Sequence, residues 1–133
     1  MEFIEWKDSY SVGNVLMDAH HQVFFRIVRM FGESASLDDQ DDMKKCIAFL
    51  VEYVSMHLGA EEALMRKADY PELDQHKALH ETFARKIRSA RDIFLKDPSA
   101  LATEELLQTM QDWFMNHVLD EDRKYMPYLQ KHN

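Results

Sequence analysis

The chain has 133 residues, of which 46% are hydrophobic, and a formal net charge of −8. This length suits one domain with a single core, and the acidic balance argues against nucleic acid or an anionic membrane surface as the main partner. No hydrophobic run approaches the roughly 20 residues that span a bilayer, and the first residues lack the pattern of a secretion signal. Cys46 is the only cysteine, which excludes an internal disulfide. These features predict a cytoplasmic protein.

Hydrophobic residues recur at the helical spacing i, i+3, i+4, i+7 in four stretches. These stretches cover about residues 17–31, 40–67, 71–96 and 103–126. Gly32 is expected to cap the first helix at its C-terminus, and the aspartates of the following loop are suited to capping the second. Pro71 fits the first turn of the third helix. Pro98 is expected to end that helix, since the residue before a proline is disfavoured in helical geometry.

Four amphipathic helices joined by short links predict an all-α protein, an up-down-up-down four-helix bundle. Residues 1–16 form an N-terminal extended arm in this interpretation, and its aromatic residues Phe3, Trp6 and Tyr10 are expected to pack across the bundle. Residues 17–131 form the bundle. We therefore expect residues 1–133 to be a single domain.

Metal-binding side chains fall on the inner face of every predicted helix. They are His21, His57, Glu61, His76, His80 and His117. A lone inward histidine is usually a hydrogen-bonded core residue, but burying this many polar groups without partners costs on the order of 1 to 3 kcal/mol for each. A shared cation removes that cost, so the pattern predicts a metal site. His20 and His132 lie off the inner faces and are expected to face solvent.

The number of candidate ligands indicates which metal is bound. Five imidazoles with one or two carboxylates exceed the four ligands of a tetrahedral zinc site. Mixed nitrogen and oxygen ligands suit first-row transition metals, and the facing helices of a bundle are where dinuclear iron sites are built. The residues alone therefore favour a pair of iron ions.

The motifs around these residues resemble those of the hemerythrin family, and of its single-domain bacterial members in particular. In chain order they read "DAHHQVFF", "HLGAEEALM", "YPELDQHKALHETF" and "WFMNHVLDEDRKY". The resemblance implies a single hemerythrin-like domain with two iron ions (Fe2+/Fe3+). One iron would be held by His76, His80 and His117 and the other by His21 and His57. Glu61 and Asp122 would bridge both irons, together with an oxo or hydroxo group.

One implied ligand conflicts with regular helical geometry. Asp122 lies five residues after His117, about 140° around an α-helix, whereas Glu121 at i+4 is better aligned. A π-type widening absorbs one residue and would bring Asp122 to the inner face, together with Tyr125 and Leu129. Following the family motif, we predict an irregular turn between His117 and Asp122.

The implied ligand set leaves room for one further ligand. If each iron takes about six ligands, the protein ligands and one bridging oxygen leave a single vacant position, on the iron held by two histidines. The motifs surround it with a hydrophobic pocket that would admit a small neutral diatomic molecule. Its expected lining is Phe25, Leu58, Trp113, Phe114 and Val118. Phe114 stands where the family usually carries leucine, so oxygen affinity cannot be transferred from the family.

Reversible dioxygen binding for storage, transport or delivery is thus the function that the resemblance implies, and we do not expect an enzyme. Two alternatives remain open. The chain could be an oxygen or redox sensor that acts through a separate partner, or a di-iron enzyme acting on peroxide or nitric oxide. A metal-free interaction bundle fits the inward histidines badly. A monomer is expected, and the sequence identifies no protein partner.

Overall fold

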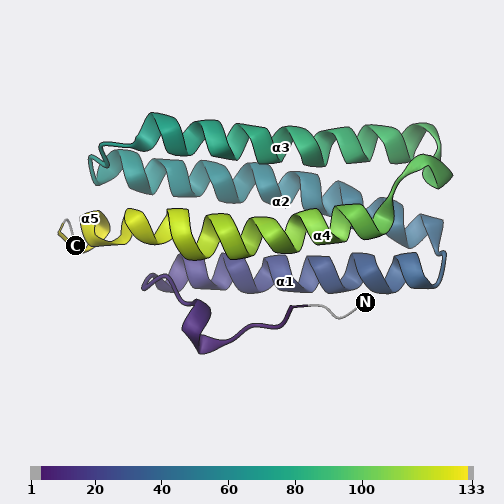
Figure 1. The fold of residues 1–133 in the computed structure, drawn as a ribbon, viewed down its shortest axis with the longest axis horizontal. Helices are drawn as coiled ribbons and strands as arrows, with labels where there is room; N and C mark the ends of the chain where they lie inside the picture. Colours follow the sequence, from purple (N-terminus) through teal and green to yellow (C-terminus); the bar gives the residue numbers. More distant parts are fainter. Residues whose placement is uncertain (1–3, 132–133) are drawn as a thin grey trace.

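The computed structural model describes residues 4–131, which form an antiparallel bundle of long helices (Figure 1). The long helices are α1 (Val15–Ser36), α2 (Gln40–Lys67), α3 (Leu73–Lys96) and α4 (Thr103–Trp113). After α4 the chain continues through a π-helix, η3 (Phe114–Glu121), and a 3-10 turn, η4 (Asp122–Lys124), into the short α5 (Met126–Lys131). This is the predicted up-down-up-down architecture.

Side-chain caps explain where the first two helices begin. The Asn14 side chain accepts a hydrogen bond from the backbone N–H of Met17, so α1 starts at Val15, two residues earlier than predicted. Asp39 caps α2 in the same way by accepting from the N–H of Asp42, as expected from the aspartate-rich loop. The prediction that Gly32 ends α1 is wrong. Gly32 is buried inside that helix, which runs on to Ser36.

The two prolines lie close to the ends of α3. Pro71 was expected in the first turn of this helix, but it lies in the turn just before it, and α3 begins two residues later, at Leu73. The helix ends at Lys96, and the Asp97 side chain then accepts from the N–H of Ser99 to start the short turn η2 (Pro98–Ala100). Proline lacks a backbone donor and restricts the residue before it, which accounts for both boundaries.

The irregular turn predicted in the last helix is confirmed. The chain adopts π-helical geometry over Phe114–Glu121 and 3-10 geometry over Asp122–Lys124. Tyr125 and Leu129 are buried, at 0% and 7% exposure, as the widened turn requires. The widened turn therefore accommodates one extra residue at the place that the family motif indicated.

The arm that precedes α1 lies against the bundle through aromatic contacts. Tyr10 stacks on Phe25, with ring centroids 5.9 Å apart and an interplanar angle of 2°, and Trp6 meets the same ring edge-on at 6.1 Å. At the other end of the chain, Arg123 donates to the backbone carbonyl of Ser9 at 2.6 Å. The expected packing of Trp6 and Tyr10 is confirmed, whereas Phe3 lies outside the described residues.

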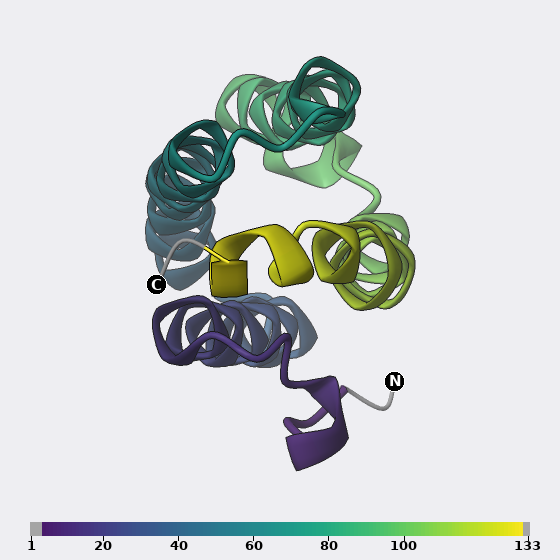
Figure 2. The ribbon, with the colours of Figure 1, turned by 90° about the vertical axis from the view of Figure 1, so that its left-hand side faces the viewer.

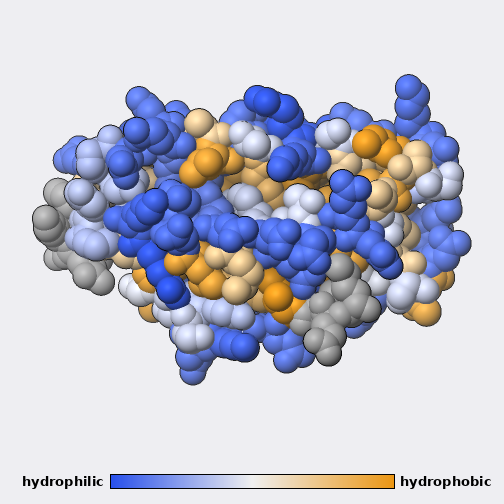
Figure 3. Space-filling view, in the orientation of Figure 1, coloured by the Kyte–Doolittle hydropathy of each residue, from blue (hydrophilic) through white to orange (hydrophobic). Residues whose placement is uncertain are grey.

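Viewed end-on, the helices surround one core, with α2 neighbouring both α1 and α3 (Figure 2). The face in Figure 3 is mostly hydrophilic, and hydrophobic side chains show mainly along the seams between helices. No helix within residues 4–131 is both long and apolar enough to cross a bilayer.

Candidate metal centre

All the metal-binding side chains predicted from the sequence meet in the core of the bundle. The helices α1, α2 and α3 contribute five of them, and the π-helix η3 and turn η4 supply the last two. The set is His21, His57, Glu61, His76, His80, His117 and Asp122, and none of its members is more than 5% exposed. Groups of this kind with their ligand atoms close together could hold metal ions, and two such groups form here.

The larger group combines three histidines with both carboxylates. The Nε2 atoms of His76 and His80 lie 3.2 and 2.9 Å from Oε1 of Glu61. On the other side, the Nε2 atoms of His76 and His117 each lie 3.0 Å from Oδ1 of Asp122. One oxygen from each carboxylate therefore faces three imidazole nitrogens.

The smaller group faces the second oxygen of each carboxylate. Nε2 of His57 lies 3.8 Å from Oε2 of Glu61, and Nε2 of His21 lies 3.8 Å from Oδ2 of Asp122. Glu61 and Asp122 thus stand between the two groups, with one oxygen directed to each. This is the arrangement that two ions sharing both carboxylates require.

Buried polar atoms without hydrogen-bond partners indicate whether these residues fit a pair of cations. Among residues 4–131, six buried ligand-type atoms of this cluster make no hydrogen bond. They are Nδ1 and Nε2 of His21, Nε2 of His57, Oε2 of Glu61 and both carboxylate oxygens of Asp122. Leaving such atoms unpaired costs about 1 to 3 kcal/mol each. Cations bound between them would satisfy five of these atoms, so the donor set fits metal ions, and its histidine-rich composition fits iron.

Burial sets the protonation of most of these histidines. It lowers the pKa of His21 to about 4 and the pKa values of His57 and His117 to about 3. A histidine ligates a metal through a deprotonated nitrogen. These low pKa values therefore keep three of the five imidazoles ready to bind at neutral pH.

The pKa values of the two carboxylates shift in opposite directions when the protein is free of metal. Burial would raise the pKa of Glu61, but hydrogen bonds with His76 and His80 outweigh it and hold the pKa well below its usual range. Burial and the Glu61 charge raise the pKa of Asp122 well above its usual range. The carboxylates of Asp122 and Glu61, at 3.0 and 3.2 Å, outweigh burial and raise the pKa of His76 to about 9. Two carboxylates this close need positive charge, which here His76 supplies in part.

The π-helical turn decides which acidic residue reaches the cluster. Asp122 is fully buried and joins the cluster, whereas Glu121 points to the surface side, where Lys124 Nζ lies 3.0 Å from its Oε1. The structure therefore favours the family motif over regular helical geometry. Tyr125, three residues further on, places its ring 5.7 Å from that of His76.

Two outer residues contact the cluster in ways that helical periodicity did not reveal. His20 was expected to face solvent, but it is half-buried and its Nδ1 lies 2.8 Å from Nδ1 of His57. On the other side, Nδ1 of His80 lies 2.9 Å from Oε2 of Glu62. In the sequence, the only indication of these contacts is that both residues are adjacent to predicted ligands. His132, also expected to face solvent, lies outside the described residues.

The predicted pocket residues lie on different sides of the cluster. Phe25 and Phe114 pack edge to face at 4.6 Å, and Phe114 also meets the ring of His21 at 5.7 Å. Tyr10 of the arm covers both phenylalanines. Val118 is fully buried. Leu58 is also buried, and it lines a surface cavity between α2 and α3 that Glu62 lines as well.

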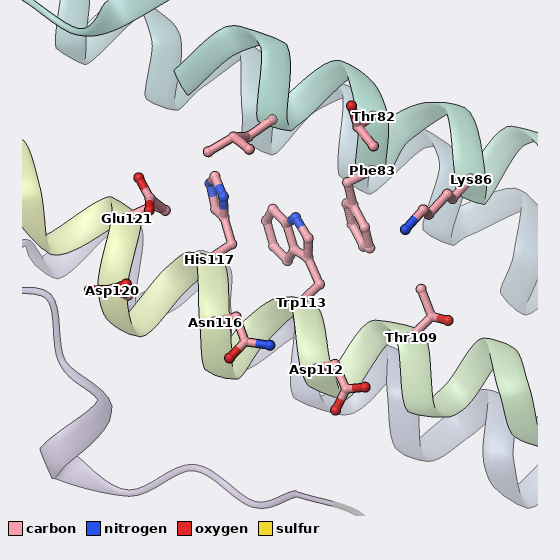
Figure 4. A pocket seen from close by; sticks show the side chains of 11 residues that line it. Thr82, Phe83, Lys86, Thr109, Asp112, Trp113, Asn116, His117, Asp120 and Glu121 are labelled. Atoms are coloured by element: carbon pink, nitrogen blue, oxygen red, sulfur yellow. The ribbon is translucent and has the colours of Figure 1, made fainter. Parts of the chain in front are cut away.

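Trp113 lies beside His117 rather than His21, and Phe24 connects it to this phenylalanine pair, at 6.1 Å from the indole and 6.3 Å from the ring of Phe114. Its indole stacks on the ring of His117 at 4.6 Å and on the ring of Phe83 at 4.1 Å, so the three rings form one stack (Figure 4). A surface cavity of about 500 Å³ reaches this stack, and Lys86 and Asp112 are among the residues that line it. Phe25 and Phe114 flank His21, and Trp113 flanks His117.

Comparison with known proteins gives a consistent result. The family model described as "Hemerythrin HHE cation binding domain" matches residues 12–129. The chain is 26% identical to a bacteriohemerythrin of Clostridium acetobutylicum, covering 91% of this chain and 97% of that one. It is 24% identical to a myohemerythrin of Theromyzon tessulatum, covering 91% and 89%. Among solved structures, a tyrosine variant of hemerythrin superimposes with a TM-score of 0.90 at 25% identity, covering 97% and 98%.

Proposed function

The chain belongs to the hemerythrin family, and on this basis we propose that it binds dioxygen reversibly at a non-haem di-iron centre. Storage, transport or delivery of oxygen is the role that this activity serves. The family model and the curated relatives span nearly the whole chain, which supports treating residues 1–133 as one hemerythrin-like domain.

The proposed ligands divide between two iron positions. His76, His80 and His117 would hold the first iron, His21 and His57 would hold the second, and Glu61 and Asp122 would be shared between them. The single observation that carries this assignment is the opposed orientation of the two carboxylates. In each of them one oxygen faces the three-histidine group and the other faces the two-histidine group.

An iron pair held by these residues would supply the reversible two-electron chemistry that oxygen binding needs. The protein's own residues decide what reaches that pair. Phe25 and Phe114 close the side of His21 with hydrophobic surface, and Tyr10 covers them from outside. Such a lining admits a small neutral molecule and disfavours water and large polar substrates.

The ligand balance favours binding over oxidation of a substrate. Bundle di-iron oxidases commonly use four carboxylates with two histidines, whereas this cluster has five histidines and two carboxylates. Fewer anionic ligands leave the centre more positive, which disfavours highly oxidised iron. The low pKa values of His21, His57 and His117 keep those imidazoles neutral, consistent with this balance.

The test is an anaerobic oxygen titration of the reduced, iron-loaded protein. We expect two irons per chain by elemental analysis, and an absorption change on adding oxygen that reverses when oxygen is removed. The matched variants His57→Ala and Glu52→Ala lie on the same helix, and only the first should abolish the reversible change. Fewer than two irons, or oxygen consumption that continues with each addition, would overturn the proposal. Turnover of added peroxide or nitric oxide would instead favour an enzyme acting on one of them.

A further inference from the structure

His20 lies next to the metal cluster, although it is not one of the predicted ligands. Its ring lies 5.0 Å from that of His57 at an interplanar angle of 69°, with the two Nδ1 atoms 2.8 Å apart. His57 is therefore contacted from outside the cluster at the one ring nitrogen that does not face the carboxylates.

Tyr53 completes the contact between α1 and α2. Its ring stacks on His57 almost in parallel, at 5.6 Å and 5°, and its hydroxyl donates to the backbone carbonyl of His20. Tyr53 is 5% exposed and His57 is 1% exposed. The imidazole of His57 is thus held across one face by Tyr53 and at its edge by His20.

The surroundings of the two ring nitrogens favour one direction for the hydrogen bond. Nε2 of His57 faces Glu61 but has no hydrogen-bond partner, whereas Nδ1 has one in His20, and a nitrogen that binds a metal carries no proton. The proton of the neutral ring therefore lies on Nδ1. His57 donates from Nδ1–H, and Nδ1 of His20 accepts.

From these contacts we infer that His20 is a positioning residue for the two-histidine metal position, because it holds His57 in the tautomer and orientation that direct Nε2 to the centre. The inference rests on the proposed function, since it concerns the same di-iron site. Outer partners of this kind typically change metal affinity by 10- to 100-fold when they are removed.

The corresponding partner on the other side has different chemistry. Nδ1 of His80 donates to the carboxylate of Glu62 at 2.9 Å. An anionic acceptor makes a histidine ligand more basic than a neutral imidazole acceptor does. The three-histidine position therefore has the stronger outer partner, and the two-histidine position has the weaker one. The position where an external ligand would bind is the one that we expect to release its metal first.

The first test reads the tautomer directly in the metal-free protein. Ring-nitrogen NMR at pH 7 should place the His57 proton on Nδ1 in the wild type and in His20→Gln, whose amide oxygen can still accept. In His20→Leu, which removes the acceptor, the proton should shift substantially to Nε2. An unchanged tautomer in His20→Leu would overturn the inference, whether or not the protein binds iron.

The second test follows iron retention against a chelator. We expect His20→Leu to lose one of its two irons 10- to 100-fold faster than the wild type, with a matching fall in azide affinity. His20→Gln should stay within about threefold. Gln22→Leu, a polar-to-apolar change two residues along the same helix, is the matched control and should leave both readouts unchanged. Glu62→Gln should speed loss of iron without changing azide affinity.

The outcomes separate this inference from the proposed function. A wild-type protein that fails to load two irons defeats the proposed function, and the tautomer measurement still decides the role of His20. A wild-type protein with two irons, and a His20→Leu variant with the same iron retention and azide affinity, defeats only the role of His20. Equal unfolding midpoints of metal-free His20→Leu and His20→Gln would show that their difference in iron retention is not a general loss of stability.

Discussion

Replacing His57 by glutamine should flatten the pH dependence of stability in the metal-free protein. Burial lowers the pKa of His57 to about 3 in the folded chain, against about 6.5 in the unfolded chain. The unfolded state therefore binds the proton more readily. The folded state has its full stability from this group above pH 6.5, and loses it as the pH falls below 6.5 toward 3.

The size of the effect follows from these two pKa values. One pH unit between the pKa and the solution corresponds to about 1.4 kcal/mol. The cost of keeping the buried imidazole neutral is about 0.2 kcal/mol at pH 7 and about 2 kcal/mol at pH 5. Glutamine does not titrate, so the fall in unfolding free energy from pH 7 to pH 5 should be about 2 kcal/mol smaller in His57→Gln than in the wild type.

Urea unfolding of both metal-free proteins, followed by circular dichroism at the two pH values, measures this difference. The helical content before adding urea serves as the control that both chains are folded. Comparing the variant with the wild type removes the opposing contributions of Asp122 and His76, whose pKa values are raised. Equal losses of stability in the two proteins would refute the reasoning, because His57 would then not be held neutral by burial.

Three further predictions concern the cluster and its surroundings. Asp122→Asn should lower the iron content from two per chain to one or none, while the exposed neighbour in Asp120→Asn should keep two; elemental analysis decides. Phe114→Leu removes part of a fully buried ring, so it should cost roughly 1 kcal/mol of stability and speed azide binding in stopped-flow experiments. Gly59→Ala should raise the unfolding free energy by roughly 0.5 to 1 kcal/mol with unchanged iron content, because an added Cβ meets no atom within 4 Å; urea unfolding measures it.

Periodicity was sufficient to predict the four helices and the inward histidines. The hydrophobic stripe of each helix includes its ligand candidates, so burial of the stripe carries those side chains into the core. The end of α1 was predicted less well. Gly32 resembles a cap in sequence, but it is buried inside the helix, and only the packing of the neighbouring helices reveals that.

Asp122 and His20 show two different limits of what can be predicted from the sequence. Regular geometry favoured Glu121, and the family motif was needed to identify the π-helical turn that brings Asp122 inward. His20 was placed on the solvent side because its angle around α1 differs from that of His21. Its contact with His57 depends on how closely α1 and α2 approach, and spacing within one helix carries no information about that distance.

The two tryptophans of the chain reach the cluster through different contacts. Trp113 is stacked directly on His117, while Trp6 touches Phe25, which leads through Phe114 to His21. Iron bound at the proposed positions would quench the light emitted by both indoles, and more strongly that of Trp113, which lies against a proposed ligand. With Trp6 replaced by phenylalanine, ordinary fluorimetry of Trp113 would follow the filling and emptying of the cluster without any added label.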